Sequence, residues 1–231
     1  MPTRTTSHRL GRRIASLLLI AGGLTLAFPF WSAAYTRYQQ GHLSSDYRRA
    51  SAAFAVGEQR QASALALLHT PQMRARHLAA LFARGLKPGD PIGRLVIRRI
   101  HLDRVVVQGN TGAASLNPET DAAYLRGGPV HYGVTGLPGS GREPFAVAGH
   151  RTTYAAPFYS LNQLRRGDRI VVDTPYGSFV YRVARLTTVL PSDVGVLYDR
   201  GYGLVLTTCT PPYSASHRLV VWATADGFRL K

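Results

Sequence analysis

The chain has 231 residues and is 45% hydrophobic, which suits one buried domain with an anchor and excludes both two full domains and a wholly disordered chain. Its formal net charge is +16, and 26 of its 28 basic residues are arginines scattered along the sequence. Because no DNA-reading helix or aromatic RNA-binding motif accompanies this charge, we expect no nucleic-acid partner. The charge instead favours attraction to an anionic membrane or wall surface.

The first predicted element is a membrane anchor. Residues 1–13 form a basic tail with four arginines and no acidic residue, and residues 14–35 carry no charged side chain. A helix of about 20 residues crosses the hydrocarbon core of a bilayer, and short basic flanks stay in the cytoplasm. We therefore expect a single transmembrane helix in the cell membrane, with the rest of the chain outside. A cleaved secretory signal is the alternative, although the apolar stretch exceeds the usual signal core.

Residues 36–90 are polar and alanine-rich, and they predict a helical or partly disordered stalk. Thr70 and Pro71 form a good helix start, because a hydroxyl caps the helix and proline needs no N–H in the first turn. Gly85 can end that helix. An earlier helix is expected around residues 46–66.

Residues 91–231 predict a single catalytic domain dominated by β-strands. Short β-branched runs alternate with turn signals, and strands at this spacing indicate a barrel or a sandwich. One short helix is expected between Pro157 and Leu164. The predicted strands are Leu95–Ile100, Val105–Gln108, Phe145–Gly149, Ile170–Thr174, Phe179–Leu190, Leu204–Thr208 and Leu219–Ala225.

The single cysteine, Cys209, excludes an internal disulfide and a multi-cysteine metal site. The histidines form no metal-ligand pattern and the acids do not cluster, so we predict no metal and no cofactor. Cys209 ends an apolar strand, where a substrate could reach its thiol. The alternative is an inert buried cysteine.

Two residues are candidate partners of Cys209. His150 ends the strand that begins at Phe145, and Arg218 opens the strand after Cys209. A thiolate nucleophile, an imidazole acid and base, and a guanidinium that stabilises an oxyanion suffice for acyl transfer. His217 adjoins Arg218, but alternation along a strand points it to the opposite face.

Two motifs resemble the sortase family. Residues 206–211 read LTTCTP, similar to the sortase nucleophile strand, with an arginine nine residues after the cysteine. Residues 148–154 read AGHRTTY, similar to the histidine region, and the resemblance extends over about residues 91–225. It implies a sortase-type eight-stranded β-barrel with short helices. It also implies transpeptidation by Cys209, His150 and Arg218 through a thioester acyl-enzyme.

The resemblance also implies the partners, which are proteins with a C-terminal sorting signal and an amine acceptor such as a peptidoglycan precursor. Residues 128–132, which read GPVHY, are similar to class E sortases, which implies cell-wall anchoring of proteins with an LAXTG- or LPXTG-like signal. Tyr132 is then similar to a tyrosine that reads the second signal residue, and Thr208 and Tyr154 become candidate substrate contacts. Thr208 could equally be an ordinary strand residue without a contact to the substrate. The sequence TPP at 210–212 departs from the class and leaves the signal preference open.

Two other functions compete with a housekeeping sortase. A pilus-polymerising sortase would use a pilin lysine as its amine, and such enzymes often carry an Asp-Pro-aromatic lid. Here Asp90 and Pro91 are followed by Ile92, so no such lid is expected. A membrane-anchored binding module without enzymatic activity would not need Cys209.

Overall fold

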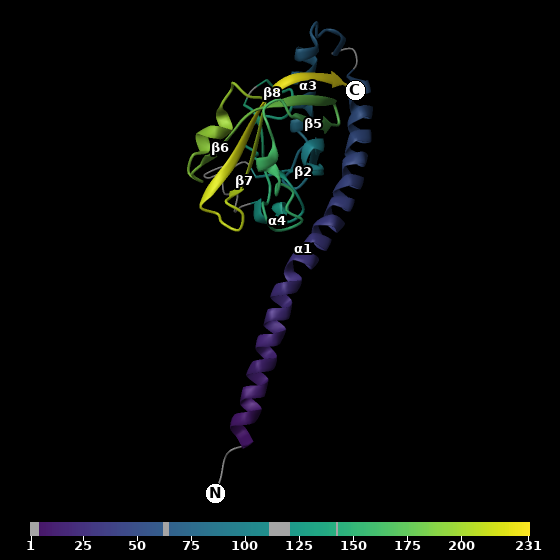
Figure 1. The fold of residues 1–231 in the computed structure, drawn as a ribbon. Helices are drawn as coiled ribbons and strands as arrows, with labels where there is room; N and C mark the ends of the chain where they lie inside the picture. Colours follow the sequence, from purple (N-terminus) through teal and green to yellow (C-terminus); the bar gives the residue numbers. More distant parts are fainter. Residues whose placement is uncertain (1–4, 62–64, 111–120, 142) are drawn as a thin grey trace.

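The computed structural model describes residues 5–61, 65–110, 121–141 and 143–231. A β-barrel lies beside the C-terminal half of a long N-terminal helix, whose N-terminal half projects away from it (Figure 1). The barrel closes in the order β1-β2-β3-β4-β7-β8-β6-β5, which confirms the predicted eight-stranded barrel. Its strands are β1 (Pro91–Ile97), β2 (Leu102–Gln108), β3 (Val130–His131), β4 (Phe145–Ala148), β5 (Arg169–Thr174), β6 (Gly177–Val189), β7 (Leu204–Thr210) and β8 (His217–Leu230).

The structure corrects the predicted strands in two places. Strand β3 was not predicted, because two residues are too few to show an alternating pattern. Residues 98–100, predicted to end the first strand, instead form the 3-10 turn η1 (Arg98–Ile100), which His101 closes at a left-handed φ of 52°. The predicted helix between Pro157 and Leu164 is shorter, because only η3 (Leu161–Gln163) forms there. The other short helices of the barrel domain are α4 (Ala122–Leu125) and η4 (Val194–Tyr198).

Alternation along the strands divides their apolar side chains between two clusters. The cluster inside the barrel includes Phe145, Val147, Leu204, Leu206, Leu219, Val221 and Ala223. The cluster on the outer face of the same strands includes Ala146, Ala148, Val205, Val220 and Trp222. The outer cluster also contains Leu125 of α4 and Leu197 of η4, so these short helices cover that face of the sheet.

Helix α3 (Pro71–Ala83) begins where the sequence predicts it. The Thr70 hydroxyl accepts a hydrogen bond from the Met73 N–H at 3.1 Å, and Pro71 occupies the first turn. The buried side chains of α3, which include Leu78 and Phe82, belong to the same cluster as the barrel interior. This helix therefore contributes to the core of the barrel domain.

Helix α1 (Thr5–Arg60) runs without a break through the predicted span and the first part of the predicted stalk. Among the described residues, it is the one helix long and apolar enough to cross a membrane. Its apolar side chains before the barrel are exposed, for example Leu19 and Leu26, each 77% exposed. Apolar side chains exposed along a whole helix are expected of a segment that lies in lipid.

The C-terminal half of α1 docks on the barrel through apolar contacts, such as Phe54 against the core cluster, and through polar contacts. The Gln40 amide accepts from the Val105 N–H at 2.8 Å and donates to the carbonyls of Val105 and Gly127 at 3.1 and 2.9 Å. Strand β3 pairs with β2 only at residues 107 and 108 of β2. At Val105 the Gln40 side chain therefore supplies the hydrogen bonds that a neighbouring strand would otherwise make. Further along α1, the Tyr47 hydroxyl donates to the Asp173 carbonyl at 2.8 Å.

We expect Gln40→Ala to lower the free energy of unfolding by about 1–3 kcal/mol, because part-buried backbone groups of β2 would lose their partner. Chemical denaturation of the full chain in detergent measures this loss. Gln39→Ala is the matched control, since Gln39 bonds only to the Tyr35 hydroxyl of its own helix among the described residues. An equal loss in both variants would contradict the structural role of Gln40.

Candidate active site

Cys209 and Arg218 lie opposite one another on antiparallel strands. The β7–β8 register pairs them directly, next to the pair Thr210 and His217 that ends the ladder. Directly paired residues bring their Cβ atoms to about 4.5–5.5 Å. Cys209 is a half-buried free cysteine, whereas Arg218 is only 3% exposed.

His150 lies beside Cys209 because β4 and β7 are neighbouring parallel strands. Their register sets Ala148 beside Thr207, so the residues two positions further on are His150 and Cys209. Past the end of β4 the pairing continues, since the Gly149 N–H donates to the Thr207 carbonyl at 3.1 Å. The Thr208 hydroxyl then donates to the Gly149 carbonyl at 2.7 Å and fixes the backbone just before His150.

All three candidate catalytic residues fall on the outer face of the sheet. Alternate residues of a strand share a face, so Cys209 lies on the side of Val205 and Arg218 on the side of Val220. Both valines belong to the outer cluster, and so does Ala148, two residues before His150. The three strand ends therefore present a thiol, an imidazole and a guanidinium to one surface. His217 is exposed on the opposite side, as the alternation predicts.

The position of Arg218 is fixed by the loop that precedes it. Its Nη1 donates to the carbonyls of Ala215 and His217 at 2.9 and 3.0 Å. A guanidinium held in this way keeps its charge beside Cys209 without depending on a flexible side chain. Such a charge can stabilise an oxyanion.

Tyr132, a candidate substrate contact, follows β3 and lies against the base of the site. Its hydroxyl is 2.8 Å from the Thr207 hydroxyl, and its side chain belongs to the outer cluster. Burial raises the pKa of Tyr132 to about 12, so the phenol stays neutral. The phenol is close enough to Arg218 and Cys209 to interact with both electrostatically.

Tyr154, the other aromatic candidate, packs beside His150 with 5.2 Å between ring centroids. It lies in a run of three non-glycine residues in the left-handed region, where Tyr154, Ala155 and Ala156 have φ values of 50°, 58° and 42°. Each such residue costs roughly 1–2 kcal/mol, so the surrounding contacts must hold this turn in place. One contact is with α1, whose Phe28 ring lies 6.1 Å from the Tyr154 ring.

Sequence reasoning missed two arginines that shape the site. Arg151 is 5% exposed, and its guanidinium donates to Asn162 at 3.0 Å and to the Cys209 carbonyl at 3.5 Å. Its position directly after His150 was the available signal. Arg126 lies with its guanidinium carbon 6.0 Å from the centre of the Tyr154 ring, and nothing in the sequence marks it.

The pKa of His150 is lowered, first by burial and then by the positive charge of Arg126. Both effects disfavour the imidazolium, so they favour a neutral ring that can accept a proton. A cysteine thiolate beside it would act in the opposite direction. The arrangement thus has the groups that a cysteine acyl transfer needs, in adjacent positions.

Comparison with known proteins agrees with this chemistry. The Sortase domain family model matches residues 95–226. Sortase SrtE1 of Streptomyces coelicolor is 40% identical over 150 residues, which are 59% of this chain and 40% of that protein. Sortase SrtE2 of the same organism is 34% identical over 88 residues, which are 34% of this chain and 35% of that protein. The matched segments thus span less than half the length of these curated relatives.

Two solved structures share the fold. Sortase E1 of Streptomyces coelicolor, crystallised with a tripeptide in its active site, has a TM-score of 0.53 and 29% identity, covering 63% of this chain and 94% of that one. Sortase E of Streptomyces avermitilis has a TM-score of 0.51 and 31% identity, covering 62% of this chain and 93% of that one.

We expect Arg126→Gln to raise the pKa of His150, because loss of a neighbouring cation stabilises the imidazolium. An NMR titration of the His150 ring should then show its midpoint at a higher pH than in the unaltered protein. Arg185→Gln is the control, since Arg185 packs on the Trp222 ring at 4.1 Å and does not contribute to the pKa shift of His150. A midpoint that stays in place or falls would contradict the electrostatic role of Arg126.

Proposed function

Because the chain belongs to the sortase family of cysteine transpeptidases, we propose that it cleaves a C-terminal sorting signal and transfers the acyl product to an amine. The observation that carries this proposal is the direct pairing of Cys209 with Arg218. The parallel register of β4 with β7 places His150 next to the same pair. The amine belongs to a cell-wall precursor, and the protein substrates carry an LAXTG- or LPXTG-like signal. The similarity to class E sortases supports this signal and the housekeeping role.

The reaction proceeds in two acyl-transfer steps. In the first, the Cys209 thiolate attacks the threonine carbonyl of the signal, and the C–N bond to the next residue breaks. His150 takes the proton of the Cys209 thiol and gives it to the leaving amine, and a thioester remains on Cys209. In the second, the acceptor amine attacks the thioester carbonyl and His150 takes a proton from it. The C–S bond then breaks and the thiolate is restored.

Arg218 acts at both tetrahedral intermediates. Its charge stabilises the oxyanion that forms on the attacked carbonyl. The two loop carbonyls that hold its Nη1 support this role, because they position the guanidinium before substrate arrives. A positioned charge needs no reorganisation during the reaction.

The three candidate substrate contacts are proposed to act in different ways. Tyr154 lies beside His150 on the rim, where its ring can pack on the substrate. Tyr132 is buried and interacts electrostatically with Cys209, so it lies at the base of the site. The Thr208 hydroxyl is committed to the Gly149 carbonyl, so its contribution is mainly to hold the rim in shape.

We further propose that the enzyme is anchored in the cell membrane by residues 14–35, with residues 1–13 in the cytoplasm. Residues 36–90 then link the anchor to the catalytic domain of residues 91–231 outside, and α3 within this link packs into the core of that domain. The exposed apolar half of α1 and its continuous passage to the barrel support this arrangement. The basic N-terminal tail supports the orientation.

We expect Cys209→Ala to abolish formation of a thioester with an LAXTG- or LPXTG-like peptide. The full chain in detergent is incubated with peptide and hydroxylamine, and mass spectrometry detects the covalent adduct and the released hydroxamate. Retained activity in Cys209→Ala would make the mechanism wrong.

We expect His150→Ala to reduce turnover by about 10²–10⁴-fold, because positioned proton transfer contributes on that scale. The rate of hydroxamate formation measures it. His217→Ala is the matched control, since this histidine is exposed on the other face of β8. Equal losses in the two variants would contradict the assignment of His150.

A further inference from the structure

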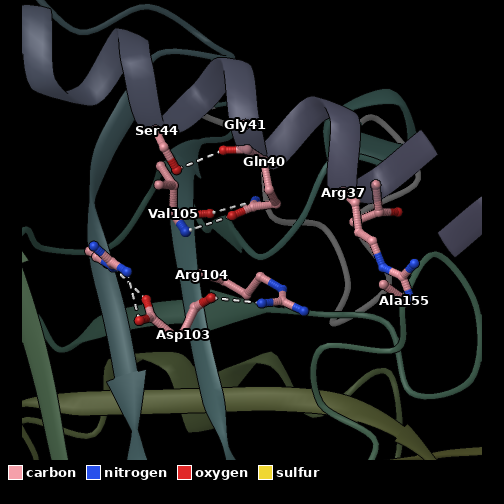
Figure 2. A pocket seen from close by; sticks show the side chains of 10 residues that line it. Arg37, Gln40, Gly41, Ser44, Asp103, Arg104, Val105 and Ala155 are labelled. Carbon is pink, nitrogen blue, oxygen red and sulfur yellow. Dashed lines mark hydrogen bonds and ion pairs between the residues drawn. The ribbon is translucent and has the colours of Figure 1, made fainter. Parts of the chain in front are cut away.

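A cavity of about 290 Å³ lies between α1 and the β1–β2 hairpin, apart from the proposed catalytic residues. Figure 2 shows Arg37, Gln40 and Ser44 of α1 on one side of it, and Asp103 and Arg104 of β2 on the other. Ala155, from the left-handed turn, closes one end. The volume is several times the roughly 30 Å³ of one water, so a phosphate group fits inside.

The charges that line this cavity favour an anion. Its single carboxylate, Asp103, is already engaged by Arg94 through two hydrogen bonds, one of them 2.7 Å from Nη2. The two other guanidinium groups of the lining belong to Arg37 and Arg104. The cavity thus keeps a net positive charge after its internal ion pair is formed.

Both of these guanidinium groups have unused donors. Arg104 donates from Nη1 to the Asp103 carbonyl at 2.8 Å, but its Nε is buried without an acceptor. The Arg37 side chain is exposed and makes no hydrogen bond or ion pair with any residue that the structure describes. Figure 2 shows the Arg104 guanidinium extending toward the end of the cavity where Arg37 and Ala155 lie. An anion in the cavity would supply acceptors for the remaining Nη donors of both side chains.

The cavity also lies at a defined height on α1. Arg37 is two residues beyond Tyr35, where the uncharged stretch ends, and a helix rises about 1.5 Å per residue. Helical side chains lean toward the N-terminus, so the Arg37 guanidinium reaches back toward that boundary. The headgroup layer extends about 5–7 Å beyond the hydrocarbon core. Arg37 would therefore lie among the lipid phosphates if residues 14–35 span the bilayer.

We propose that this cavity binds the phosphate group of an anionic membrane lipid through Arg37 and Arg104. The proposal rests on the membrane anchor proposed above, but not on the transpeptidase chemistry. Guanidinium groups match phosphate oxygens in pairs of parallel hydrogen bonds, which a diffuse surface charge does not provide. The bound headgroup would join α1 to the hairpin and would contact the turn that carries Tyr154.

The test is native mass spectrometry of the full chain, released from detergent with phosphatidylglycerol or with phosphatidylcholine. We expect one phosphatidylglycerol to remain bound in preference to phosphatidylcholine. The double variant Arg37→Gln and Arg104→Gln should bind it at least about tenfold more weakly, because two charge-assisted contacts are lost. Unchanged affinity in this variant would overturn the proposal.

Two further double variants distinguish a specific lipid site from non-specific attraction of anionic lipid to positive charge. Replacing Arg37 and Arg104 by lysine keeps the charge but loses the paired geometry, so we expect intermediate affinity. Replacing the exposed Arg48 and Arg60 of α1 by glutamine removes the same charge elsewhere on the helix and should leave binding unchanged. An equal loss in this control, or full affinity in the lysine pair, would show diffuse attraction only and overturn the proposal.

Two readouts identify the ligand source and keep the proposals separate. Glycerol phosphate in solution should bind much more weakly than the lipid, and equal binding would overturn the lipid assignment. Thioester formation with a soluble peptide should be unchanged in the glutamine double variant. Cys209→Ala should keep the lipid while losing the thioester, so failure of either proposal leaves the other testable.

Discussion

The parallel pairing of β4 with β7 is the constraint on which the rest of the site depends. β7 carries Cys209 and pairs on its other side with β8, which carries Arg218. Because β4 runs in the same direction as β7, both strands end at the same edge, and His150 leaves β4 at the level of Cys209. A shift of this register by one residue would turn His150 to the other face. The backbone hydrogen bond from Gly149 to Thr207 and the bond from Thr208 to Gly149 therefore set the relation between thiol and imidazole.

Around this edge the protein concentrates positive charge. Arg218 is paired with Cys209, Arg151 contacts its carbonyl, and Arg126 lies near His150. Burial and Arg126 disfavour the imidazolium of His150. Peptide binding, which excludes water, would strengthen each of these interactions.

The sequence predicted the features that follow from local pattern. Short β-branched runs indicated a barrel or a sandwich, and the resemblance to sortases selected the barrel. Thr70 and Pro71 marked the start of α3, and a thiol after an apolar strand marked Cys209. The two-residue β3 lacks a pattern and could not be found in this way. Gln40 docks α1 by contacts with the distant backbone groups of Val105 and Gly127, and a polar residue on a helix gives no local signal of such a role. Arg126 likewise matters only because folding brings it to Tyr154.

The docking of α1 also determines how the enzyme would encounter its substrates. The turn between β7 and β8 lies at the end of the barrel from which the N-terminal half of α1 projects (Figure 1), and Phe28 touches Tyr154 on that side. With residues 14–35 in the bilayer, the contact between Phe28 and Tyr154 would hold the catalytic rim at the outer part of the bilayer in one orientation. Enzyme and substrate protein would then meet by lateral diffusion, because both are tethered to the membrane. The enzyme would reach the scissile bond of a sorting signal only if that bond lay at nearly the same distance from the membrane as the catalytic rim.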